Sequence, residues 1–223
     1  MRDSAHQLRT PLAVLKAQVQ SARRGDVAPE QALVEISQTV ERATTLANQM
    51  LSLAKVEQLR QQPESALLDL GDVVRHIALD LSPLVADKAL DFELAADDAV
   101  TVRAHQWMLQ ELTRNLLHNA IKHSPAGAPL SVRVQAEGDE AVLTVRDDGP
   151  GISAELRQRL FAPFSAGNTA SGSGLGLAIC REIVLALGGR ISLDNRTVPN
   201  PGGTDRVTGL DAVVRLPLSR HNG

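Results

Sequence analysis

Aromatic side chains are scarce in this chain of 223 residues: they make up 2 % of the sequence, and tyrosine is absent. Proteins that hold single-stranded nucleic acid stack its bases on aromatic rings, and this sequence has few to offer. The chain also has no excess of basic residues, since 23 Lys and Arg face 26 Asp and Glu for a net charge of −3. Composition therefore argues against a nucleic-acid partner.

Cysteine and long apolar runs are also nearly absent. The single cysteine, Cys180, excludes an intramolecular disulfide framework and a Cys-rich zinc site. No stretch approaches the length of a membrane span, and no signal-peptide pattern opens the chain. With 43 % hydrophobic residues, the length suffices for one large domain or two small ones. We expect a soluble, intracellular protein or fragment.

The first 60 residues carry apolar side chains at alternating steps of three and four, the heptad period of packed helices. The two runs are Leu8, Leu12, Leu15, Val19 and Ala22, then Leu33, Ile36, Val40, Ala43, Ala47, Met50 and Ala54. Gly25 and Pro29 separate them, as residues typical of a helix end and of a first helical turn. The pattern predicts an antiparallel helical hairpin. One hairpin buries such stripes poorly, so we expect two chains to form a four-helix bundle.

A polar, proline-bearing linker over 61–66 is expected to separate the hairpin, 1–60, from a second domain, 67–223. The patterns predict helices over 70–80 (capped within 70–72), 106–122 and 175–187, and strands over 92–94, 100–102, 130–134, 141–145, 191–193 and 212–216. Gly138 and Asp139 are expected to turn a hairpin between the third and fourth strands, whereas 197–208 is expected to be a surface loop. Helices combined with an antiparallel sheet indicate an α+β domain.

His6 opens the first predicted helix. At about 100° per residue it falls about 160° from the centre of the apolar stripe, so it faces solvent and shares its face with Thr10. An ordinary surface histidine is far commoner than a reactive one, and position alone favours that interpretation.

The predicted helix over 106–122 displays Asn115, Asn119 and Lys122 on one face. Asparagine is a poor helix former, so its repetition there is unexpected. Amide oxygens beside an ammonium suit a complex of Mg²⁺ with a triphosphate, because Mg²⁺ keeps most of its water and takes few protein oxygens. Spacing alone slightly favours a solvated polar face.

Asp147, Gly149 and Gly151 follow a predicted strand directly. A turn is the expected structure, because Asp-Gly-Pro-Gly is strong turn chemistry. Glycines also allow the backbone to approach a ligand, and a carboxylate accepts hydrogen bonds from an exocyclic amine. From the residues alone, binding at this turn stays open.

Glycines at 172, 174 and 176 open the last predicted helix. Glycine-rich backbone leading into a helix N-terminus suits an anion, although the spacing matches neither a P-loop nor a dinucleotide fingerprint. The small, polar residues 166–173 before it have the composition of a mobile lid.

Taken in order, these blocks resemble the sensor histidine kinases of two-component systems over nearly the whole chain. Residues 6–12 resemble the H box of that family, 115–119 its N box and 147–151 its G1 box. Residues 160–164 resemble its F box, and 172–177 its G2 box. The resemblance implies a dimerisation and phosphotransfer hairpin followed by a Bergerat-type α/β sandwich that binds ATP.

The resemblance also implies a role for each matched residue. His6 would attack the γ-phosphorus of MgATP and pass the phosphoryl group to an aspartate of a response regulator, Gln7 would orient its ring, and Thr10 would serve a phosphatase activity. Asn119 would ligate Mg²⁺ with Asn115 beside it, Lys122 would contact phosphate, and Asp147 would accept from the adenine amine. The remaining nucleotide contacts would come from Gly149, Gly151, Phe161, Phe164, Gly172, Gly174, Gly176 and Leu177.

Several positions depart from the family pattern. Gln7 stands where the family most often has Glu, so we expect phosphorylation to survive at a lower rate. Asp148 stands where many relatives carry Asn, and 165–167 lacks the usual aromatic and basic residues of the lid. Only five residues precede His6, so we expect the chain to be the cytoplasmic portion of a membrane sensor whose upstream region is missing. Two alternatives remain: an ATPase module of the same fold that drives conformational change, and a degenerate kinase that acts as a scaffold.

Overall fold

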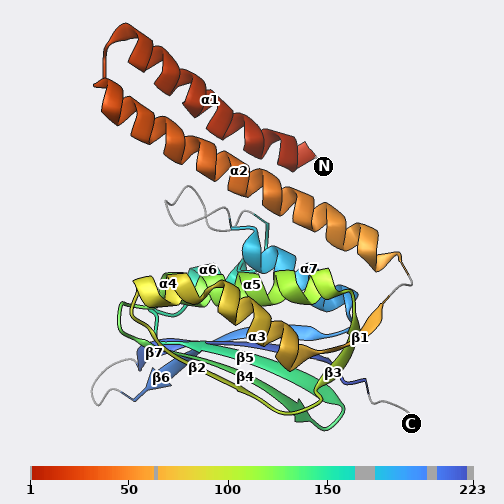
Figure 1. The fold of residues 1–223 in the computed structure, drawn as a ribbon. Coiled ribbons are helices and arrows are strands. Elements are labelled where there is room, and N and C mark those ends of the chain that lie inside the picture. Colours follow the sequence, from red (N-terminus) through yellow and green to blue (C-terminus); the bar gives the residue numbers. More distant parts are fainter. Residues whose placement is uncertain (1, 63–64, 164–173, 200–204, 220–223) are drawn as a thin grey trace.

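The computed structural model describes residues 2–62, 65–163, 174–199 and 205–219, and for residues 2–7 the backbone alone. Two long helices, α1 (Arg2–Arg24) and α2 (Pro29–Arg60), form an antiparallel hairpin that lies over an α/β sandwich (Figure 1). The turn between them confirms both sequence signals, because Gly25 has φ 77° and Pro29 is the first residue of α2.

The hairpin leaves much of its predicted apolar stripe uncovered. The buried residues Ala32, Thr39 and Leu46 are not members of that stripe but directly precede its positions 33, 40 and 47. Within the stripe, Leu33 is 68 % exposed and Val40 is 45 % exposed. On α1, Leu12 and Val19 are likewise exposed. One chain therefore buries the face next to the predicted stripe of α2, and leaves the stripe itself half-buried or exposed.

The sandwich has one sheet of five strands and one layer of helices. The sheet order is β2 (Asp91–Ala96), β4 (Pro129–Glu137), β5 (Glu140–Asp147), β7 (Arg206–Pro217) and β6 (Arg190–Val198). Over one face lie α3 (Leu70–Asp80), α4 (Ser82–Asp87), α5 (Gln106–His123) and α7 (Gly176–Ala186), whereas the short α6 (Ala154–Gln158) follows β5 (Figure 1). A second sheet pairs β1 (Ala66–Asp69) with β3 (Thr101–Ala104).

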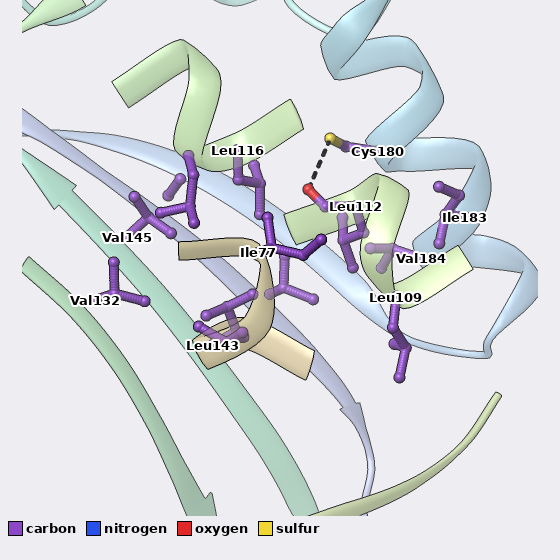
Figure 2. Packing of buried hydrophobic residues seen from close by; sticks show 14 of the residues in the cluster. Ile77, Leu109, Leu112, Leu116, Val132, Leu143, Val145, Cys180, Ile183 and Val184 are labelled. Atoms are coloured by element: carbon purple, nitrogen blue, oxygen red, sulfur yellow. Dashed lines mark hydrogen bonds between the residues drawn. The ribbon is translucent and has the colours of Figure 1, made fainter. Parts of the chain in front are cut away.

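The core lies between the helix layer and the large sheet. Leu112 and Leu116 of α5 meet Leu143 and Val145 of β5 there, all within 2 % of complete burial (Figure 2). Cys180 of α7 is fully buried with Sγ 3.9 Å from the Leu112 carbonyl oxygen, and burial raises the pKa of its thiol. This confirms the expectation of a small, unreactive core residue.

The core continues into the hairpin. Leu46 and Val56 of α2 belong to the same buried cluster as the sandwich residues. Beside them, Lys55 Nζ lies 4.3 Å from the ring centre of Trp107 on α5, a cation–π contact. The hairpin is thus packed on the sandwich through both apolar and polar contacts.

Three local expectations were wrong. The large sheet is mixed, since β2 pairs with β4 in parallel. The final hairpin continues through Val198 and Arg206 instead of opening at 197, with a register shift after Arg196. The cap of α3 is Asp69, whose carboxylate accepts from the Asp72 amide at 3.0 Å, because a side-chain acceptor must precede the helix to reach its free N–H groups.

Candidate functional site

The polar face of α5 forms one wall of the candidate site. Its opposite face is buried in the core, which leaves Asn115 and Asn119 half-buried and Lys122 exposed at the edge. The Asn115 amide nitrogen donates to the Glu111 carbonyl oxygen at 2.8 Å and to the Glu111 carboxylate at 3.2 Å. Asn115 is therefore fixed in one orientation, with its oxygen available on the side away from Glu111.

The first turn of α7 lies directly against that oxygen. A Cβ atom placed on Gly176 would be 3.0 Å from Asn115 Oδ1 and 3.8 Å from the Asn119 amide nitrogen. Glycine at 176 thus lets the start of α7 approach the two asparagines closely. The structure thus brings the asparagines of α5 together with the glycines that open α7, although the two motifs lie about 60 residues apart in sequence.

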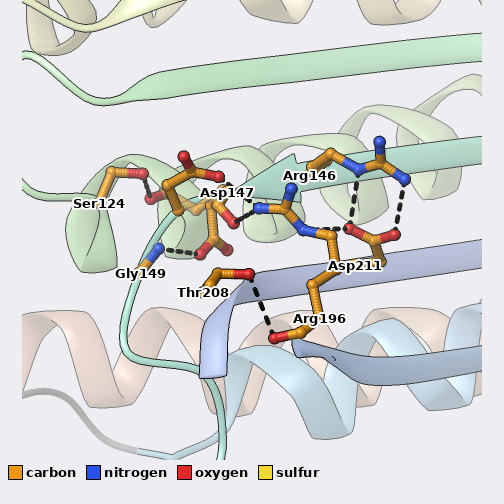
Figure 3. A network of polar contacts seen from close by, with 9 residues as sticks. Ser124, Arg146, Asp147, Gly149, Arg196, Thr208 and Asp211 are labelled. Carbon is orange, nitrogen blue, oxygen red and sulfur yellow. Dashed lines mark hydrogen bonds and ion pairs between the residues drawn. The ribbon is translucent and has the colours of Figure 1, made fainter. Parts of the chain in front are cut away.

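Asp147 is the last residue of β5, and the turn after it packs on the C-terminal end of α5. The residue is 5 % exposed, and its carboxylate accepts from the Gly149 amide at 2.8 Å (Figure 3). A Cβ on Gly149 would lie 2.9 Å from the His123 carbonyl oxygen, so this close approach requires glycine. Burial raises the pKa of Asp147, and the bond from Gly149 opposes the rise.

Lys88, which follows α4, holds the C-terminal end of α5. Its ammonium donates to the carbonyl oxygens of Ile121 at 2.8 Å, Lys122 at 2.7 Å and Ser124 at 2.9 Å. These are acceptors that a helix end leaves without intrahelical partners. The site is thus built along α5. Gly176 of α7 lies near the middle of this helix, and Asp147 of β5 lies near its C-terminal end.

Two histidines of α5 favour the neutral state. Burial lowers the pKa of both His118 and His123, and the charge of Lys122 lowers it further. Partial desolvation also lowers the pKa of Lys122, although its side chain is exposed at the edge of the site. The end of the helix is therefore crowded with groups for which a further positive charge is unfavourable.

The other predicted site residues that the structure describes have fewer contacts with the asparagines of α5 or with Asp147. Phe161 is half-buried against the core with the Arg181 guanidinium carbon 6.0 Å from its ring centre. Gly174 has φ 68°, Gly151 has φ 70°, and Leu177 packs on the core. Thr10 is exposed on α1 of the hairpin.

Four predicted site residues fall outside what the structure describes. Phe164 and Gly172 lie outside the described residues, as does the proposed lid at 166–173. The backbones of His6 and Gln7 belong to α1, but the structure does not describe their side chains.

Three residues that support the site were not predicted from the sequence. Glu111 fixes Asn115, and its spacing of four residues on the same helix was a usable signal. Asn195 and Arg196 of β6 contact the turn after Asp147. No local pattern points to them, because their contacts depend on strand register.

The donor set suits a metal bound together with phosphate. In the described part of the chain, no group of three or more His, Cys, Asp and Glu side chains is placed to hold a metal ion. The half-buried amides of Asn115 and Asn119 instead offer the one or two protein oxygens that Mg²⁺ accepts. Within the same described residues, no helix combines the length and apolar content needed to cross a membrane.

Comparison with known families and structures agrees with this geometry. Residues 1–59 match the His Kinase A (phospho-acceptor) domain, and residues 104–220 match the histidine kinase-, DNA gyrase B- and HSP90-like ATPase family. The sensor protein kinase PmrB of Pseudomonas aeruginosa is 34 % identical over 196 residues, which cover 86 % of this chain and 41 % of PmrB. The sensor protein QseC of Salmonella typhi is 34 % identical over 221 residues, 96 % of this chain and 46 % of QseC.

The chain thus spans less than half the length of these curated relatives. Among solved structures, the Acinetobacter baumannii histidine kinase AdeS has the same fold, with a TM-score of 0.74 at 24 % identity over 96 % of this chain and 98 % of that one. A helical phospho-acceptor region, an ATPase sandwich and relatives named as sensor kinases lead to one conclusion: the chain belongs to the sensor histidine kinases of two-component systems.

Proposed function

We propose that this chain transfers the γ-phosphoryl group of ATP to His6 and then to an aspartate of a response regulator. The observation that carries the proposal is the assembly on α5: Asn115 against Gly176 near its middle, and the turn after Asp147 against its end. The hairpin that matches a phospho-acceptor domain supplies the acceptor.

Asp147 is the residue that we assign to the adenine base. Its carboxylate accepts hydrogen bonds only, which suits the exocyclic amine of adenine. Gly149 and Gly151 keep the turn free of side chains, so the nucleotide can approach its backbone. Burial limits competition from water at this carboxylate.

The polyphosphate is assigned to the polar face of α5 that carries Asn115, Asn119 and Lys122. The residues that we expect around it are Asn115, Asn119, Lys122, Gly172, Gly174, Gly176 and Leu177, with Phe161 and Phe164 anchoring the lid. Asn119, with Asn115 beside it, would hold Mg²⁺, which supplies charge neutralisation on the phosphates when bound. About 12 Å of helix separates Asn115 from His123, so Asn115 and the turn after Asp147 contact different turns of α5, whereas Lys122 lies in the same turn as His123.

His6 is assigned as the nucleophile. A neutral imidazole nitrogen is available near pH 7, and its lone pair would form the N–P bond as the bond from the γ-phosphorus to the bridging oxygen breaks and ADP leaves. Gln7 is expected to orient the ring by hydrogen bonding and Thr10 to act in hydrolysis of the phosphorylated regulator. The phosphoryl group on nitrogen then remains reactive toward a carboxylate.

The hairpin also supports association of two chains. Leu12, Val19, Leu33 and Val40 are exposed at heptad spacing on α1 and α2. Apolar side chains repeated in this way favour packing against an equivalent surface, and two hairpins would complete a four-helix bundle.

The test is phosphorylation with γ-labelled ATP and Mg²⁺. We expect label on the protein that is lost in acid and stable in base, and its loss in His6→Ala. His76→Ala, at an exposed histidine of α3, is the matched control and should retain label. Release of free phosphate without protein label would favour an ATPase module, and neither label nor release would favour a scaffold; both results contradict the proposal.

A further inference from the structure

Two neighbouring residues of β6 hold the two ends of the turn that follows Asp147. The Asn195 side chain binds the backbone of Ile152 twice: its amide nitrogen donates to the carbonyl oxygen, and its oxygen accepts from the amide, both at 2.8 Å. The Arg196 guanidinium donates to the Asp147 carbonyl oxygen at 2.6 Å and pairs with the Asp148 carboxylate. The turn is thus fixed at its start and at its end.

Arg196 reaches Asp147 across the strand between them. In the sheet, β7 separates β6 from β5, and Gly209 of β7 is the partner of Arg196. A Cβ at 209 would lie 2.1 Å from both the Arg196 Nη2 atom and the Asp147 carbonyl oxygen. Only glycine leaves room for the contact, and the register shift after Arg196 lies at the same place.

The guanidinium is also held from its other side. Its Nε lies 3.1 Å from Asp211 Oδ1, and Asp211 pairs in turn with Arg146 at 2.8 Å (Figure 3). Charges therefore alternate along Arg146, Asp211, Arg196 and Asp148. The side chains of Arg196 and Asp211 are 28 % and 19 % exposed, so solvent screens this pair less than a surface ion pair.

We propose that Arg196 is a positioning residue that makes the candidate site select an aminopurine over an oxopurine triphosphate. The inference rests on the proposed function, in which Asp147 accepts from the base. A 6-oxopurine presents an acceptor where adenine presents a donor, so a fixed carboxylate disfavours it. A turn released at Asp147 would let the carboxylate move away, and the distinction between the two bases would be lost.

Calorimetric binding of ATP and inosine triphosphate to the chain, with Mg²⁺, tests this proposal. The wild-type chain should prefer ATP. Arg196→Gln should lose about tenfold in ATP affinity, the scale of one charge-assisted hydrogen bond, with little change for inosine triphosphate. The matched control is Arg190→Gln, on the same strand as Arg196. It removes an exposed ion pair with Glu140 of β5 and should leave both affinities unchanged.

A second variant reaches the same contact without removing a charge. Gly209→Ala places a methyl group between Arg196 and Asp147 and should reduce the preference for ATP in the same way. If this variant does not fold, as judged by circular dichroism, Arg196→Gln decides alone.

The ratio of the two affinities separates positioning from a general loss of structure. Equal losses for both nucleotides in Arg196→Gln, or an unchanged ratio, would overturn the proposal while leaving the proposed function intact. A wild-type chain that binds both nucleotides equally would contradict the role of Asp147, and one that binds neither would contradict the proposed function and this inference together.

Discussion

Asp147 is a carboxylate in a buried position, and burial disfavours its charged form. Its position at the end of β5 buries a carboxylate, and burial raises its pKa, whereas the Gly149 amide and the charge of Arg196 oppose that rise. Because the folded state binds the Asp147 proton more tightly than the unfolded state does, stability falls as pH rises from the ordinary pKa of aspartate through the raised pKa, and the loss is complete above it. The carboxylate of Asp147 therefore destabilises the fold at neutral pH, and the proposed contact with adenine gives a reason for it.

Replacing Asp147 with Asn tests both the destabilisation and the proposed contact. At pH 7 we expect the free energy of unfolding to rise by about 1 kcal/mol, while ATP affinity falls at least about tenfold. The gain in stability should shrink as pH falls through the raised pKa, because protonated Asp147 is also neutral. Urea denaturation at pH 7 and pH 4, with calorimetric binding of ATP, measures both effects.

Asp98→Asn is the control for a carboxylate in solvent, and it should change neither quantity. A loss of stability at pH 7 in Asp147→Asn would show that the buried carboxylate stabilises the fold, contrary to this account.

At the level of elements, the end of α5 depends on a residue from outside the helix. Lys88 supplies three hydrogen bonds to carbonyl oxygens at or just beyond the last turn. The helix therefore keeps its final turn, with Lys122 and His123, in a fixed position next to Gly149.

Lys88→Gln should destabilise this end of α5. Loss of hydrogen bonds from a charged donor costs about 2 kcal/mol, which corresponds to a fall of about 4–8 °C in Tm for a domain of this size. Amide hydrogen exchange should accelerate in the last turn of α5 before the rest of the helix. Lys16→Gln, at an exposed lysine of α1, should shift Tm by less than 1 °C, and an equally small shift in Lys88→Gln would refute the role.

Sequence patterns predicted the elements that depend on neighbours along the chain. The spacing of Asn115, Asn119 and Lys122 places them on one face wherever the helix forms, and Gly138 turns the β4–β5 hairpin locally. The parallel pairing of β2 and the contact of Arg196 with Asp147 depend on which strand lies beside which, and in what register. Those choices are made by packing of the whole sheet, so no local pattern contained them.

For the whole molecule, the uncovered face of the hairpin predicts association. Leu33, Val40 and Leu51 lie within about 20° of one another around α2, and all are exposed. Leu33→Glu should weaken the dimer at least about a hundredfold, because two buried leucines are replaced by charge at once. Sedimentation velocity over a range of concentrations measures the change.

Leu79→Glu is the matched control, since Leu79 is 73 % exposed on α3, outside the hairpin. It should sediment as the wild-type chain does. If Leu33→Glu also sediments unchanged, the stripe is not the contact between chains.

The contact between Lys55 and Trp107 has a further consequence. Trp107 is the only tryptophan in the sequence, and its ring on α5 contacts Lys55 of α2. All of the tryptophan emission of this protein therefore originates at the boundary between the hairpin and the nucleotide-binding sandwich. Any reorientation of one against the other would change the surroundings of that single fluorophore, so the molecule carries an intrinsic optical reporter of its own rearrangement.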